Sequence, residues 1–99
     1  MARRGRFSEE PFGETLQALM SETKTTFRVL GERTDLSAGY LNHLAHGNRP
    51  APSTDVIVSI ARGLGVDPDH FREYRIRLVV ERLEASPAQL DRLYRRLVD

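Results

Sequence analysis

The chain has 99 residues with 15 Lys and Arg against 14 Asp and Glu, so its net charge of +1 does not by itself indicate a nucleic-acid partner. A hydrophobic share of 39% and a charged share of 29% are typical of one folded domain and exclude a disordered tail, and the absence of cysteine excludes disulfides and thiolate metal sites. No segment approaches the roughly 20 apolar residues of a membrane span, and the start has no signal-peptide apolar region, which favours a cytoplasmic protein.

The first part of the chain is predicted to hold a flexible basic arm, residues 1–7, followed by a helix. Arg3, Arg4 and Arg6 make the arm basic. Ser8 is expected to cap the helix, with two glutamates in the opening turn, where negative charge meets the positive end of the helix dipole. Phe12, Leu16, Leu19, Met20 and Thr23 fall on one face of this helix.

Two short helices are predicted next, joined by a tight turn at residues 34–37. The second helix follows Thr26, and the third starts at the cap residue Ser37 and stops before Gly47. In the turn, Leu36 is expected to point into the core. The inward residues of the two helices are Phe27, Leu30 and Thr34, then Tyr40, Leu41 and Leu44.

The rest of the chain is predicted to form three more helices after a loop at residues 47–52, where two prolines and a glycine forbid regular structure. Their expected limits are Ser53 to Gly65, Asp67-Pro68 to about residue 84, and Ser86-Pro87 to the end. Six helices and no strand predict an all-α fold.

Residues 26–66 carry the most informative pattern. Two short helices joined by a tight turn cannot bury themselves, so they need one helix before and one behind, and the sequence supplies both. This arrangement leaves the outer face of the third helix exposed. The residues with the informative order and spacing are Leu30-Gly31-Glu32-Arg33-Thr34, Leu36-Ser37, Tyr40-Leu41, Leu44, Gly47, Pro52, Ala61 and Leu64-Gly65-Val66. Over about residues 12–66 the chain resembles the Cro and phage-repressor (xenobiotic-response-element-like) helix-turn-helix family.

The resemblance implies a lambda-repressor-like, all-α bundle that binds double-stranded DNA, usually as a homodimer, and regulates transcription. It implies a DNA-binding domain at residues 8–66, with the helix at residues 37–46 in the major groove. The corresponding DNA-binding residues are Thr26 and Phe27, then Ser37, Ala38, Gly39, Tyr40, Asn42, His43 and His46, then Asn48 and Arg49 in the loop.

The charge pattern of the same segment agrees with this expectation. Between Asp35 and Asp55 there is no acidic residue, although Arg49 and several amide and imidazole side chains occur there. A surface that lies against phosphates must avoid carboxylates. Asn42 can pair with adenine in the major groove, and His43 can donate to guanine or phosphate.

Several positions depart from the family pattern and put direct base readout in doubt. The family typically has a glutamine at the position of Phe27, polar base-reading side chains at Ala38 and Gly39, and a glutamate at Ala45. Phe27 either packs onto the core or touches a thymine methyl group. Gly39 reflects either close approach of the backbone to DNA or neutral drift. These departures favour an alternative function, a protein-interaction module such as an antitoxin or a regulatory adaptor.

Other chemistries have little support in the sequence. His43 and His46 are three positions apart, but no cysteine or nearby carboxylate completes a metal site. The chain has neither a glycine-rich phosphate loop nor a Ser–His–Asp spacing, so we expect no enzyme and no cofactor. The basic arm either reaches DNA or has no role.

The last two helices, residues 67–99, are predicted to make a homodimer. The fifth is apolar on two faces, and the sixth has an apolar stripe too wide for solvent: Leu90, Leu93, Tyr94, Leu97 and Val98. The alternative is that the sixth helix folds back on the fifth within one chain and leaves a monomer. Any control by a ligand is expected to act through this part or through a protein partner.

Overall fold

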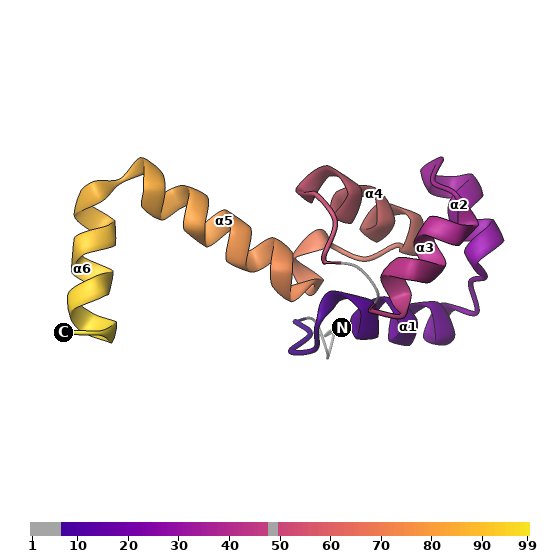
Figure 1. The fold of residues 1–99 in the computed structure, drawn as a ribbon, viewed down its shortest axis with the longest axis horizontal. Helices are drawn as coiled ribbons and strands as arrows, with labels where there is room; N and C mark the ends of the chain where they lie inside the picture. The colour runs from indigo at the N-terminus through magenta and orange to yellow at the C-terminus, as the bar shows by residue number, and fades with distance from the viewer. Residues whose placement is uncertain (1–6, 48–49) are drawn as a thin grey trace.

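The computed structural model describes residues 7–47 and 50–99. In these ranges it contains six α-helices, one short 3-10 helix and no strand, so the all-α prediction is confirmed. The elements, drawn in Figure 1, are α1 (Phe12–Thr23), α2 (Phe27–Thr34), α3 (Ala38–Ala45), α4 (Thr54–Leu64), η1 (Pro68–His70), α5 (Arg72–Ala85) and α6 (Pro87–Leu97). The arginines of the predicted basic arm lie outside the described residues.

Four of the predicted helix caps are confirmed. In each case the side-chain oxygen accepts a hydrogen bond from the backbone N–H three positions later, which satisfies one of the donors that a helix start leaves unpaired. The capping residues, with their oxygen-to-nitrogen distances, are Thr26 (3.1 Å), Ser37 (3.0 Å), Ser53 (3.4 Å) and Ser86 (3.4 Å).

The predicted cap of the first helix is wrong, because α1 begins at Phe12 and not after Ser8. The residue before a proline is disfavoured in helical conformation, so Pro11 prevents a helix from running through Glu10. Pro11 itself is the N-cap residue and supplies no side-chain bond. The Ser8 hydroxyl instead lies 2.6 Å from the Thr15 hydroxyl and accepts the Glu10 N–H at 3.1 Å.

The predicted start of the fifth helix is also wrong. Asp67 and Pro68 open η1, after which Phe71 is extended (φ −86°, ψ 128°) and α5 begins at Arg72. The Phe71 side chain is fully buried, and its ring centroid lies 4.8 Å from that of Phe12. The break between η1 and α5 therefore coincides with the residue that sends its ring into the core.

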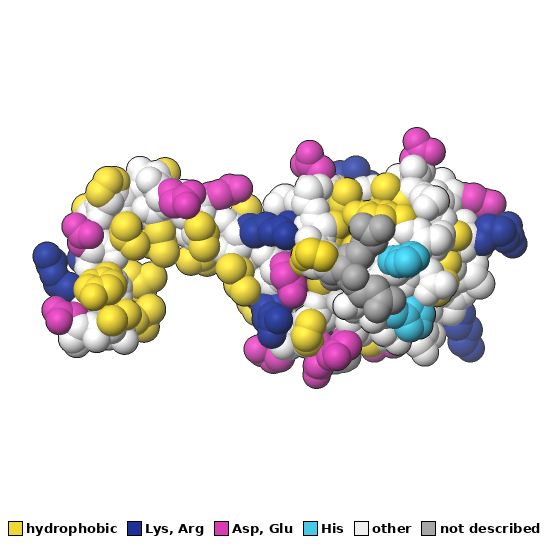
Figure 2. Space-filling view, in the orientation of Figure 1, with side chains coloured by type: hydrophobic (Ala, Val, Ile, Leu, Met, Phe, Trp, Pro, Cys, Tyr) yellow, Lys and Arg dark blue, Asp and Glu magenta, His cyan; other side chains and the backbone are white. Residues whose placement is uncertain are grey.

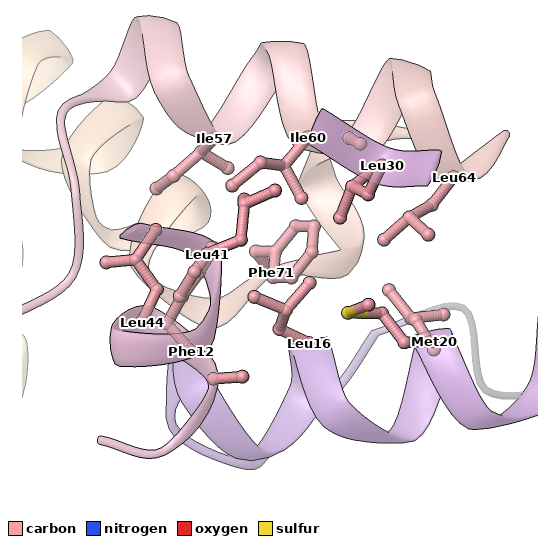
Figure 3. Close-up of a cluster of buried hydrophobic side chains, with 13 residues drawn as sticks. Phe12, Leu16, Met20, Leu30, Leu41, Leu44, Ile57, Ile60, Leu64 and Phe71 are labelled. Carbon is pink, nitrogen blue, oxygen red and sulfur yellow. The ribbon is translucent and has the colours of Figure 1, made fainter. Parts of the chain in front are cut away.

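α1 to α4 enclose one hydrophobic core, and Figure 3 shows its side chains converging from all four helices onto Phe71. The buried members are Phe12, Leu16, Leu19, Met20, Leu30, Leu41, Leu44, Ala45, Ile57, Ile60, Ala61, Leu64 and Phe71. Phe71 lies beyond residue 66, where the DNA-binding domain is expected to end, and its ring is part of this core. η1 and the base of α5 therefore belong to the same packed unit. We call α1 to α4 with η1 and the base of α5 the head.

Beyond its base, α5 leaves the head, and α6 packs against its far end (Figure 1). We call residues 78–99 the extension. The Cα radius of gyration is 15.4 Å, against about 13 Å for a compact chain of this length, because the extension projects from the head. Large apolar side chains remain exposed on α5 and α6: Ile76, Leu78, Val79, Val80, Leu90, Tyr94, Leu97 and Val98. In the part of the chain that the structure describes, no helix is long and apolar enough to span a membrane.

Glu73, in the first turn of α5, caps α1 from 61 residues away. Its Oε2 accepts the Phe12 N–H at 3.1 Å and lies 3.6 Å from Nη2 of Arg72. We expect Glu73→Ala to lower the free energy of unfolding by about 1–2 kcal/mol, because the start of α1 then loses its acceptor. Glu73→Gln keeps an acceptor and should lose less. Urea unfolding measures both, and a Glu73→Ala protein as stable as the wild type would contradict this capping role.

Candidate nucleic-acid interface

The turn between α2 and α3 is built from local hydrogen bonds and one close backbone contact. Asp35 ends α2 in the left-handed conformation, with φ of 65°. The buried Thr34 hydroxyl donates to the Leu30 carbonyl at 2.8 Å and accepts the Leu36 N–H at 3.3 Å. A Cβ at Gly31 would lie 2.6 Å from the Leu36 carbonyl oxygen, so only glycine lets the turn fold this tightly against α2.

α3 divides into an inner and an outer face, as the helical spacing predicted. Leu41, Leu44 and Ala45 are buried, and Tyr40 is half-buried against the core. The outer face is exposed and consists of Ala38, Gly39, Asn42, His43 and His46, with the cap Ser37 at its start. The structure thus brings these predicted site residues together on one surface, which we call the α3 face.

α1 holds the end of α3 in place, and the sequence reasoning missed this. A Cβ at Gly13 would lie 2.6 Å from the Leu44 carbonyl oxygen and 3.1 Å from that of Ala45. Gln17 also donates a side-chain hydrogen bond to the Ala45 carbonyl. The available signal was the glycine in the first turn of the helix, since close packing is one reason to accept its conformational cost there.

The start of α2 lies beside the α3 face. Thr26 is exposed, whereas Phe27 is half-buried and packs against the hydrophobic core. The Phe27 ring centroid lies 6.4 Å from that of His46. This packing favours the core interpretation of Phe27 and makes its ring a support for one edge of the α3 face.

The α3 face carries no acidic side chain. In Figure 2 histidine side chains lie over α3, and the acidic side chains lie around them and not between them. On the neighbouring α2, Glu32 pairs with Arg28 at 3.3 Å, so its charge is partly compensated. The loop residues Asn48 and Arg49 fall outside the described residues.

The histidines of the α3 face do not form a metal site within residues 7–47 and 50–99, where no group of three His, Cys, Asp or Glu side chains lies close enough to hold an ion. His46 Nδ1 lies 2.9 Å from the Asn42 carbonyl oxygen, one turn earlier in the chain. This contact directs one ring nitrogen of His46 toward its own helix.

Gly39 has no neighbour that requires a glycine, because a Cβ there would meet no atom within 4 Å. We expect Gly39→Ala to raise the free energy of unfolding by about 0.5–1 kcal/mol, since alanine loses less backbone entropy in a helix. Thermal or urea unfolding measures this, and a destabilised variant would contradict the open environment. Duplex binding by the same variant separates the two readings of Gly39: weaker binding indicates close approach of DNA, and unchanged binding indicates drift.

Comparisons with known proteins agree with this architecture. The helix-turn-helix domain family matches residues 11–74, which span the head from the N-cap of α1 to the base of α5. The crystal structure of the clp gene regulator ClgR from C. glutamicum is similar, with a TM-score of 0.55 and 27% sequence identity over 68% of this chain and 82% of that chain. Among curated proteins, none matches the chain. The chain belongs to the helix-turn-helix domain family, as the resemblance to Cro and phage repressors predicted.

Proposed function

We propose that the protein is a transcriptional regulator that binds duplex DNA with α3 in the major groove. The observation that carries the proposal is the α3 face, which is exposed, free of carboxylates and next to the capped start of α2. Phosphates repel carboxylates, and a helix of this kind fits the width of the major groove. The similarity to a gene regulator and the family match support the same class of function.

The contacts divide by chemistry. Thr26, Asn48 and Arg49 are assigned to phosphates, and Asn42 and His43 to base edges, since amide and imidazole groups can pair with bases. Ala38 adds a methyl group that suits thymine. Two base-reading side chains give modest discrimination, so the rest of the specificity is assigned to DNA shape and to the spacing of half-sites.

A homodimer formed through the extension would pair two such heads. The exposed apolar side chains of α5 and α6 gather on the inner side of the bend between these helices (Figure 2). α6 packs against the end of α5, and Tyr94 and Leu97 remain more than half exposed. A second copy supplies a matching apolar surface, and a two-fold dimer binds paired half-sites.

A gel-shift assay with genomic duplex fragments tests the proposal. Ala38→Glu places a carboxylate on the α3 face near the start of the helix, where the helix dipole tolerates it. We expect wild-type protein to bind at low salt and Ala38→Glu to bind at least about tenfold more weakly. Ala18→Glu, on the exposed side of α1, is the matched control and should bind like wild type. No duplex binding by the wild type would overturn the proposal and favour the protein-interaction module.

A further inference from the structure

A groove between the end of α5 and α6 brings together three arginines from two helices. It has a volume of about 330 Å³ and is lined by Arg82, Leu83, Gln89, Arg92, Leu93 and Arg96. The two leucines are half-buried, whereas the three arginines are exposed. We call this feature the arginine groove. It offers positive charge beside a small apolar surface.

The charges of the arginine groove are not compensated by the chain itself. Within residues 7–47 and 50–99, none of its three guanidinium groups forms an ion pair or a hydrogen bond with another residue. Arg92 and Arg96 are one helical turn apart, a spacing at which like charges repel each other. Arg82 adds a third positive charge from α5, and none of the lining residues is acidic. The groove is therefore complementary to a group of negative charges.

The groove is separate from the surface that we propose to bind DNA. The molecule is 47 Å long, and α6 lies at the opposite end from α2 and α3 in Figure 1. A duplex held by the α3 face of the same chain is therefore not the natural occupant of the groove.

The groove also lies on a different side of α6 from the stripe that we propose to form the dimer. Arg92 and Tyr94 are two positions apart and point to nearly opposite sides, since each residue turns a helix by about 100°. Tyr94 and Leu97 are the most clearly exposed members of the stripe, whereas Arg92 lines the groove. A second copy packed on the stripe would leave the arginine groove open.

We propose that the arginine groove binds an acidic segment of a partner protein. Planar guanidinium groups pair with carboxylates through two parallel hydrogen bonds, so several arginines select a segment with several carboxylates. Leu83 and Leu93 offer contact to an apolar side chain between these carboxylates. A small molecule suits the groove less well, because small-molecule sites enclose most of their ligand and these arginines are exposed. The proposal does not depend on duplex binding.

An NMR titration of the isotope-labelled, full-length protein at low salt tests the proposal. The probe is a capped peptide of sequence Glu-Glu-Leu-Glu-Glu. One control peptide has glutamine in place of every glutamate, and the other has alanine in place of the leucine. We expect the acidic probe to shift the backbone amide resonances of residues 82–96 and to leave those of α3 unchanged. The glutamine peptide should cause no shift, and the alanine peptide should bind more weakly than the probe.

Substitutions in the groove test which arginines bind the probe. We expect Arg92→Gln to bind it about threefold more weakly, which corresponds to the loss of one exposed ion pair. Arg82→Gln should show a similar loss, although it lies on the other helix. Arg95→Gln is the matched control, because it removes the same charge from α6 at a position that does not line the groove. This control should bind the probe like wild type.

Five results would overturn the proposal. The absence of any shift at the groove with the acidic probe would refute it outright. An equal loss of binding in Arg95→Gln would mean that only the net charge of α6 attracts the probe. Tighter binding of pyrophosphate than of the probe would assign the groove to a small anion. Loss of self-association in Arg92→Gln, measured by sedimentation, would mean that a second copy occupies the groove. Weaker duplex binding by Arg92→Gln than by Arg95→Gln would assign it to DNA.

Discussion

Leu97→Glu is expected to convert a dimer into a monomer and to weaken binding to a duplex with two half-sites by about 100-fold or more. Leu97 is 70% exposed on α6, so its side chain contributes little to the fold of one chain. A carboxylate in the apolar stripe would have to be buried in the dimer without a partner. Once the heads are separate, the second half-site no longer benefits from the high effective concentration that a linked pair provides.

Ala88→Glu is the matched control for this prediction. Position 88 lies nine residues before position 97 and therefore on the opposite side of the helix, since each residue turns a helix by about 100°. The control adds the same charge to α6 and should remain dimeric. Analytical ultracentrifugation at tens of micromolar measures both. A wild-type monomer under these conditions would refute the dimer, and a dimeric Leu97→Glu protein would exclude this stripe as the contact.

Asn42→Ala is expected to remove the preference for one base at one position of each half-site. A bidentate pair between a side chain and a base supplies about 1–3 kcal/mol of discrimination, which corresponds to about 5- to 150-fold between sequences. Asn42 is exposed on the α3 face, so its loss should leave the stability of the fold unchanged. Arg49→Ala should instead weaken binding to all sequences equally, because a phosphate contact carries no sequence information.

Selection from a randomised duplex library measures these preferences for wild type and each variant. The Arg49→Ala protein should select the same sequences as wild type, at a lower affinity. A sharp motif of several bases that survives both Asn42→Ala and His43→Ala would show that sequence is read outside α3. That outcome would contradict the assignment of base contacts and leave duplex binding itself intact.

The helices that the sequence predicted well are those whose signals are local. Ser37 and Ser53 cap their helices because a hydroxyl, an N–H three positions later and an apolar face all occur within one turn of chain. Gly65 ends α4 with a φ of 75° for an equally local reason, since glycine adopts this conformation without strain. The inner and outer faces of α3 follow from the helical spacing of its apolar residues alone.

The sequence-based predictions fail where two local signals compete for one helix start, or where the contacting residue lies far away in the sequence. Ser8 has the chemistry of a cap, but Pro11 decides where α1 starts. The acceptor at that start is Glu73, which is 61 residues away and invisible to any local pattern. Arg77 likewise contacts Pro52 across 25 residues. Side chains on α5 thus shape the head, and sequence spacing within residues 8–66 could not indicate them.

Duplex affinity measured across a range of salt concentrations tests the central claim most directly, because it reports how many phosphates the protein neutralises. With about three to five phosphates per subunit, log affinity against log salt should fall with a slope near −3 to −5 per subunit. Arg49→Ala should make that slope shallower by about 0.9. An absence of duplex affinity at low salt, or an affinity that does not change with salt, would contradict the account of this protein as a DNA-binding regulator.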